Sequence, residues 1–249
     1  MTQKAALVTG GARRIGCAIS LALHGAGYAV AIHTNQSVRE AEALRDEITR
    51  AGGRGAVVRA DLAEHASVTG LVGAAVEAVG PLTLLVNNAA MFEPDAIGAL
   101  DAARFDRQFA VNLRAPLFLS EAFAAQAAEG ASIVNILDQR VFKLTPQFVS
   151  YTLAKSALHS ATRMLAQALA PTVRVNAVAP GPTMPSARQD AADFARQAAA
   201  VPLGHGSTAE EIAAAVVYLA SARSITGTTL IVDGGQHLAW QTPDAIGNE

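Results

Sequence analysis

The stretch "AALVTGGARRIG", residues 5–16, decides the fold of this 249-residue chain. Its start is mostly apolar, as in a buried strand, and a cluster of glycines follows at once. Glycine permits a tight turn and a close approach to a ligand, and the next helix would offer its N-terminal N–H groups to a pyrophosphate. Such a cluster can also be an ordinary turn. Its position after the first strand favours a dinucleotide site.

Strand and helix patterns alternate on both sides of this turn. Ala- and Leu-rich stretches of helical period, such as 38–52 and 209–222, separate short apolar runs. Repeated βαβ units of this kind predict an α/β protein with a single doubly wound Rossmann fold, a seven-stranded parallel sheet with helices on both faces. The strand-like runs are 5–9, 28–33, 55–60, 82–87, 132–137, 173–179 and 229–233.

We find no linker or low-complexity tract, so we expect residues 1–249 to form one domain. Residues 182–207 begin with prolines and have weak strand character, and we expect a flexible substrate loop with a short helix there. Residues 236–249, with Trp240, form a C-terminal tail whose role the sequence leaves open.

The composition, 51% hydrophobic with a net charge of −2, fits a compact protein without general attraction to nucleic acid or anionic membranes. Cys17 is the only cysteine, which excludes an intramolecular disulfide and makes a reducing cytoplasm the simplest compartment. Neither a signal peptide nor a membrane-spanning run is expected. We expect no metal, because no ligand spacing occurs among the histidines at 24, 65, 159, 205 and 237.

The end of the second strand indicates which dinucleotide binds. NAD sites usually place an acid there to bind the ribose 2′-hydroxyl, but this chain reads "AIHTNQS". Arg13 and Arg14 lie in the glycine turn and Arg39 follows the second strand, where they would attract a 2′-phosphate. The pattern favours NADPH; alternatively, these arginines are merely solvated.

A second motif lies further on. The apolar strand in "SIVNILDQR" ends in Asp138, and the helical stretch "SYTLAK" carries Tyr151 and Lys155 on one face. An ammonium near a phenol favours the phenolate, so we expect Lys155 to lower the pKa of Tyr151. We expect all three to be catalytic; alternatively, Asp138 is a helix cap or a surface acid.

The whole chain resembles the short-chain dehydrogenase/reductase family. That resemblance implies a Rossmann fold, an NAD(P) cofactor, usually a tetramer, and an Asn–Ser–Tyr–Lys catalytic set. The matching pieces occur in the family's order: "TGGARRIG", "ADL" (60–62), "NNAA" (87–90), Asn112 in "VNLRAP", "YTLAK" (151–155), "APG" (179–181) and "VDGG" (232–235).

Two departures from the common pattern resemble the pteridine reductase branch, which includes dihydromonapterin reductases. Arg14 replaces the middle glycine of the turn, and Asp138 stands where the catalytic Ser would fall. "NNAAMFEP" is similar to a segment of that branch in which a Phe, here Phe92, stacks on the pterin. Ala90 stands where some members have Ser, so one polar contact is missing.

Chemistry agrees with this branch, because the nitrogen of a reduced C=N bond needs a proton and a carboxyl group donates one better than a hydroxyl does. We therefore expect an NADPH-dependent reductase that converts a dihydropteridine or dihydromonapterin to the tetrahydro form, by hydride transfer with an Asp–Tyr–Lys proton relay. Such a reductase would act in tetrahydrobiopterin or folate metabolism. A carbonyl reductase, for example of a 3-oxoacyl thioester, is the alternative. A regulatory protein that only binds NADP is disfavoured by the Tyr and Lys. The natural pterin stays open, as does use of folate.

The resemblance assigns the site residue by residue. Asn112 should bend its helix and hold a water beside Lys155; alternatively, it is a plain polar helix residue. Asp61 should meet the adenine amine; alternatively, it is a plain loop acid. The expected catalytic residues are Asp138, Tyr151, Lys155 and Asn112, and the expected substrate contacts are Arg14, Phe92, Asp138 and Tyr151. Expected cofactor contacts are Gly10, Arg13, Arg14, Ile15, His33, Asn35, Ser37, Asp61, Leu62, Asn88, Ala89, Tyr151, Lys155, Pro180 and Gly181. A homotetramer is expected.

Overall fold

The computed structural model describes residues 4–186 and 188–240. Its seven parallel strands lie in the order β3-β2-β1-β4-β5-β6-β7, so the strand order reverses between β1 and β4. This is the predicted doubly wound sheet, and the predicted fold is confirmed. The strands are β1 (Lys4–Val8), β2 (Tyr28–Thr34), β3 (Gly55–Arg59), β4 (Leu84–Asn87), β5 (Ala131–Ile136), β6 (Val173–Pro180) and β7 (Thr229–Val232).

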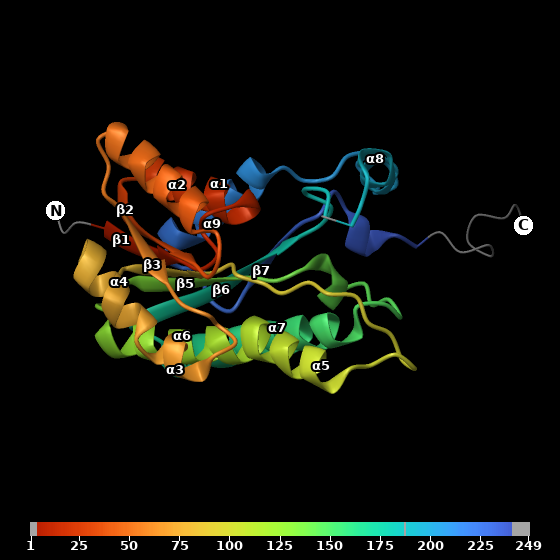
Figure 1. Ribbon diagram of the computed structural model, residues 1–249, viewed down its shortest axis with the longest axis horizontal. Helices are drawn as coiled ribbons and strands as arrows, with labels where there is room; N and C mark the ends of the chain where they lie inside the picture. Colours follow the sequence, from red (N-terminus) through yellow and green to blue (C-terminus); the bar gives the residue numbers. More distant parts are fainter. Residues whose placement is uncertain (1–3, 187, 241–249) are drawn as a thin grey trace, which may run out of the picture.

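Helices cover both faces of the sheet, as Figure 1 shows. One layer holds α1 (Arg14–Gly25), α2 (Val38–Arg50) and α9 (Ala209–Ser221). The other holds α3 (His65–Thr69), α4 (Leu71–Val79), α5 (Ala102–Phe109), α6 (Ala115–Gln126) and α7 (Val149–Leu169). Among the described residues no helix is both long enough and apolar enough to cross a bilayer.

Alternation along the strands divides the core into these two layers. In β1, Ala6 and Val8 pack toward α1 and α9, while Ala5 and Leu7 pack toward α4 and α6. Because both faces are covered, all seven residues of β2 are buried. Apolar residues in succession therefore form a strand here.

Short elements follow the carboxyl ends of the strands, where the site lies. They are the π-helical turn η1 (Ala110–Arg114) and the 3₁₀ turns η2 (Gln139–Val141) and η3 (Gln236–Leu238). The segment 182–207, which we call the substrate loop, contains α8 (Ala191–Ala199), the short helix expected there, and α8 lies apart from both layers in Figure 1. The flexibility of this loop and the single-domain organisation stay predictions, and residues 241–249 of the expected tail lie outside the described residues.

Candidate active site

A cleft of about 780 Å³ lies at the carboxyl ends of the central strands. The glycine turn, the end of β2 and the segments after β4, β5 and β6 form its walls. The structure thus brings together every expected cofactor and substrate contact, from distant parts of the chain. Asn112 is the expected site residue that does not line the cleft.

The glycine turn packs directly against the end of β4. Gly10 has a φ of +60°, and a Cβ there would come within 3.0 Å of the Ala89 Cα. A Cβ on Gly16 would collide with the carbonyl oxygen of Gly10. The hydroxyl of Thr9 accepts hydrogen bonds from the backbone N–H groups of Asn88 (2.9 Å) and Ala89 (3.0 Å). Glycine is therefore required here for close packing, and the turn is rigidly placed.

His33 ties this turn to the neighbouring strands. Its Nδ1 accepts a hydrogen bond from the Gly10 N–H at 3.0 Å, so Nε2 carries the proton and donates to the Ala60 carbonyl at 3.2 Å. Burial lowers the pKa of His33 to about 4 and keeps the ring neutral. The sequence pointed to His33 as a cofactor contact, but this positioning role was missed because it depends on strands that pair only in the folded sheet.

The arginines of the turn differ in what they contact. Arg13 lies 3.9 Å from Glu40, and both side chains are largely exposed, so this pair contributes little. Arg14 has a φ of +54°, the left-handed conformation that favours glycine, at the place where the common family pattern has glycine. Its guanidinium donates to the carbonyl oxygens of Met184 (3.2 Å) and Pro185 (2.9 Å) in the substrate loop. Arg39, which was expected to attract a 2′-phosphate, is not among the described residues that line the cleft.

Asp61 follows β3 and is already well bonded. One carboxylate oxygen accepts from the Ala63 N–H at 2.9 Å, and the other lies 3.2 Å from Arg107. The bond from Ala63, with the nearby guanidinium, holds the pKa of Asp61 below its usual value. Its carboxylate therefore stays ionised at the far end of the cleft.

Asp138 and Tyr151 form the centre of the site. One Asp138 oxygen accepts a hydrogen bond from the Tyr151 hydroxyl at 3.0 Å. The other accepts from the Arg140 N–H at 2.8 Å, which makes Asp138 the N-cap of η2. Asp138 therefore both caps η2 and contacts Tyr151. Lys155 is buried and donates to the Ile136 carbonyl at 2.6 Å.

The surroundings of Asp138 and Tyr151 favour the protonated form of both side chains. Burial raises the pKa of Asp138, and burial together with the Asp138 carboxyl raises the pKa of Tyr151 well above its ordinary value. The expectation that Lys155 lowers the pKa of Tyr151 is therefore wrong for this arrangement. The Lys155 ammonium is bonded to the Ile136 carbonyl, while the carboxyl oxygen contacts the phenol directly. Burial also lowers the pKa of Lys155 to about 8, an effect that Asp138 opposes.

Asn112 lies in the π-helical turn η1 between α5 and α6, and the bend expected there stays a prediction. Its fully buried carboxamide accepts from the Met91 N–H at 3.0 Å and donates to the Met91 carbonyl at 2.8 Å. Asn112 therefore anchors the segment that carries Phe92. The water expected beside Lys155 stays a prediction.

An aromatic wall faces Asp138. Phe92 stacks on Phe148 with centroids 4.3 Å apart and meets the Tyr151 ring edge-on at 4.7 Å. A second cavity of about 330 Å³ adjoins the cleft. The lining residues that it shares with the cleft are Phe92, Asp138, Gly181, Thr183, Met184, Ser186 and Arg188. Phe148 is among the site residues that sequence reasoning missed. Its place three residues before Tyr151 was the available signal.

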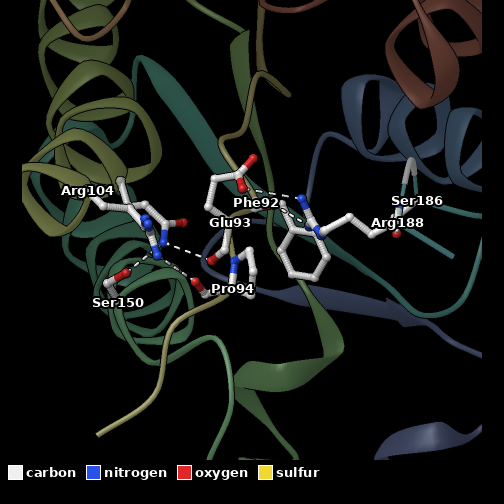
Figure 2. A network of polar contacts seen from close by, with 8 residues as sticks. Phe92, Glu93, Pro94, Arg104, Ser150, Ser186 and Arg188 are labelled. Carbon is white, nitrogen blue, oxygen red and sulfur yellow. Dashed lines mark hydrogen bonds and ion pairs between the residues drawn. The ribbon is translucent and has the colours of Figure 1, made fainter. Parts of the chain in front are cut away.

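Two further arginines in this cavity were also missed. Arg188 of the substrate loop donates to the Phe92 carbonyl at 2.7 Å and pairs with Glu93 at 3.3 Å, as Figure 2 shows. Arg140 lies over the Phe148 ring at 4.9 Å. Arg140 could have been found, because it ends the same stretch as Asp138. Arg188 could not, because nothing in its local sequence indicates contact with residues 95 positions away.

The start of α7, which carries Tyr151, is capped from another segment. The Phe148 side chain provides no cap, and instead the Asp95 carboxylate accepts from the Ser150 N–H (3.2 Å) and from its hydroxyl. Gln108 of α5 bonds both the Ser150 hydroxyl, at 2.6 Å, and the Glu93 carbonyl, at 3.1 Å. Figure 2 shows the bonds at Ser150 and Glu93, which join α7 to the segment that carries Phe92.

Comparisons with known proteins agree with this geometry. A family model described as enoyl-(acyl carrier protein) reductase matches residues 10–237. The structure of FolM alternative dihydrofolate reductase 1 from Brucella canis, complexed with NADP, is 52% identical, with a TM-score of 0.94, over 97% of this chain and 96% of that one. A short-chain dehydrogenase/reductase from Serratia marcescens is 36% identical, with a TM-score of 0.90, over 94% and 98%. Pteridine reductase 1 of Leishmania tarentolae is 34% identical over 95% of this chain and 97% of its own.

Proposed function

The chain belongs to the short-chain dehydrogenase/reductase family, and we propose on that premise that it reduces the C=N bond of a pterin with NADPH, converting a dihydropteridine such as dihydromonapterin to its tetrahydro form. One observation carries the proposal, the hydrogen bond between Asp138 and Tyr151 at the end of β5. It places a carboxyl group where a carbonyl reductase of this family needs only a hydroxyl.

NADPH fits the cleft. Gly10 and Gly16 let the backbone of the turn pack closely, and both line the cleft, where backbone N–H groups at the start of α1 can meet a pyrophosphate. The end of β2 presents Asn35 and Ser37 and has no acid of its own to bind a ribose 2′-hydroxyl. NADP in the Brucella canis relative supports this choice. When bound, NADPH supplies the hydride.

The chain's own residues supply the proton. A pterin ring held between the cofactor and Phe92 places its reacting nitrogen beside Asp138 and Tyr151. Burial raises the pKa of both side chains, which favours their protonated forms over those of a free carboxyl and a free phenol. Asp138 donates to the ring nitrogen, and Tyr151, which already donates to Asp138, replaces that proton. The Lys155 ammonium stabilises the negative charge that is left on the pair.

A homotetramer in the cytoplasm is the assembly we propose. The outer surface of the α6–α7 layer supports self-association, because Phe118, Leu153 and Met164 are 40%, 50% and 67% exposed there. Sedimentation equilibrium is expected to give four times the mass of one chain. A monomeric mass at micromolar concentration would contradict this.

The test of function follows NADPH oxidation with four substrates side by side: dihydrobiopterin, dihydromonapterin, dihydrofolate and an acetoacetyl thioester. We expect a dihydropterin to have the highest kcat/KM and the thioester to be poor. High turnover of the thioester with none of the pterins would replace the proposal with carbonyl reduction.

A further inference from the structure

We propose that Arg107 of α5 binds the adenine ring of the cofactor through the plane of its guanidinium. Arg107 is not among the expected cofactor contacts. The inference rests on NADPH as the cofactor and not on the substrate, so it goes beyond the proposed function.

The adenine half of the cofactor belongs at the β3 end of the cleft. The glycine turn follows β1, in the middle of the sheet, and Asp138 follows β5 on one side of it. With the pyrophosphate at the turn and the reacting ring at Asp138, the other half of the dinucleotide extends over β2 and β3. Asp61 and Leu62 follow β3 and line the cleft there.

The cleft wall at this end is apolar, with one guanidinium beside it. Leu62 is buried, and Val111 packs against the core. Arg107 and Val111 both line the cleft. They are four residues apart, near the end of α5 and in η1, so their side chains lie on nearly the same helical face. An apolar wall next to a planar cation suits a flat heterocycle.

The guanidinium of Arg107 is oriented but not used up by the protein. Its Nη2 lies 3.2 Å from Asp61 Oδ2, and both side chains are partly exposed. Within residues 4–186 and 188–240 this is its one hydrogen bond or ion pair, and no aromatic side chain there covers its plane. An ion pair this exposed contributes little to folding. It does hold the guanidinium in place for a ligand.

Two neighbouring arginines show what is particular to Arg107. Arg104, one turn earlier on α5, donates to the Pro94 carbonyl at 3.1 Å, as Figure 2 shows. Arg114 in η1 donates to the Ala63 carbonyl. Both tie backbone segments together, and of the three arginines only Arg107 lines the cleft.

A guanidinium at this place suits adenine better than it suits the 2′-phosphate. Its planar, weakly hydrated cation stacks on aromatic rings. Its partner Asp61 is the residue that the sequence predicts to meet the adenine amine. Asp61 also lies beside Asn35 at the end of β2, where the 2′-phosphate is expected, so a carboxylate lies between that place and Arg107.

Calorimetric titration of the full chain tests the contact without any turnover. We measure Kd for NADPH, for NADH and for the hypoxanthine analogue of NADPH, which keeps a purine ring but lacks the amine, in the wild type and in Arg107→Met. All three Kd values should rise by a similar factor, roughly threefold to tenfold, because the lost contact is with the ring. Arg107→Ala should raise them at least as much and covers a folding failure of Arg107→Met. The control Arg104→Met should leave them unchanged.

Different results overturn different claims. An unchanged Kd for NADPH in folded Arg107→Met refutes the inference, and so does an equal rise in Arg104→Met. A rise confined to NADPH would assign the guanidinium to the 2′-phosphate instead. A rise that spares the hypoxanthine analogue would restrict Arg107 to holding Asp61. A wild type that binds neither NADPH nor NADH refutes the cofactor of the proposed function itself.

Discussion

At the scale of single residues, Asp138 combines two tasks that a Ser cannot. One oxygen fixes η2 and the other holds the Tyr151 hydroxyl, and burial keeps the group ready to carry a proton. A hydroxyl at this position would bond a carbonyl oxygen but would not protonate a ring nitrogen. Under the proposed function, we therefore expect the identity of this residue to decide which class of double bond the site reduces.

Replacing Asp138 tests that statement. Asp138→Asn keeps the shape without a titrating proton, and pterin reduction should fall by roughly 10²–10⁴, the usual contribution of a positioned acid or base. Asp138→Ser should fall equally and gain activity on a carbonyl substrate. Steady-state kinetics with calorimetric NADPH affinity checks this, because cofactor binding should barely change. Full pterin activity in Asp138→Asn at every pH would restrict Asp138 to positioning the substrate.

The pKa of Lys155 predicts how kcat/KM depends on pH. Its pKa of about 8 means that the ammonium is lost above that pH, so kcat/KM should fall through about pH 8. Asp138 raises this pKa, so the residual activity of Asp138→Asn should fall at a lower pH. The free energy of unfolding, by contrast, should rise with pH. Unfolding restores the ordinary value of 10.5, so a proton is taken up between about pH 8 and 10.5 and the free energy of unfolding rises with pH there. An alkaline limb at the same pH in both proteins would contradict the link between the two groups.

At the scale of elements, the helix α7 depends on a cap that it does not carry. Asp95 bonds the Ser150 N–H and hydroxyl, one residue before Tyr151. Asp95→Ala leaves these donors unpaired and should lower the free energy of unfolding by about 1–3 kcal/mol. It should also lower kcat/KM, because the same bonds set the start of α7, which carries Tyr151.

The matched control for Asp95 is the cap of α9, whose residues do not line the cleft or the second cavity. Thr208 and Glu211 form a capping box there. Thr208→Ala should cost about 1 kcal/mol and leave kcat/KM unchanged. Urea unfolding and steady-state kinetics compare the two variants. If Asp95→Ala costs stability alone, as Thr208→Ala should, the cap does not position Tyr151.

At the scale of the whole molecule, the seven-stranded doubly wound sheet followed from the sequence because apolar runs and glycine turns are local signals. The seven strands lie where the pattern placed them, to within a few residues. The cleft was equally predictable, since parallel strands bring their carboxyl ends together. Contacts between distant segments could not be predicted in this way. The Arg188–Glu93 pair and the Asp95 cap depend on how loops fold over the sheet edge. The pKa of Tyr151 depends on which neighbour contacts the phenol, which spacing alone does not show.

Cofactor binding should be visible as a change in stability of the whole molecule, because the cleft joins segments from both halves of the chain. A ligand at a hundred times its Kd stabilises the folded state by about 2.7 kcal/mol. NADPH should therefore raise the melting temperature clearly, and NADH at the same concentration much less. Asn35→Asp places a carboxylate at the end of β2, where it repels a 2′-phosphate and accepts from a 2′-hydroxyl, so the two shifts should move toward each other. Gln147→Glu adds the same charge at an exposed position outside the cleft and should leave both shifts unchanged. Equal shifts for NADPH and NADH in the wild type, by differential scanning calorimetry, would show that the missing acid does not select the cofactor.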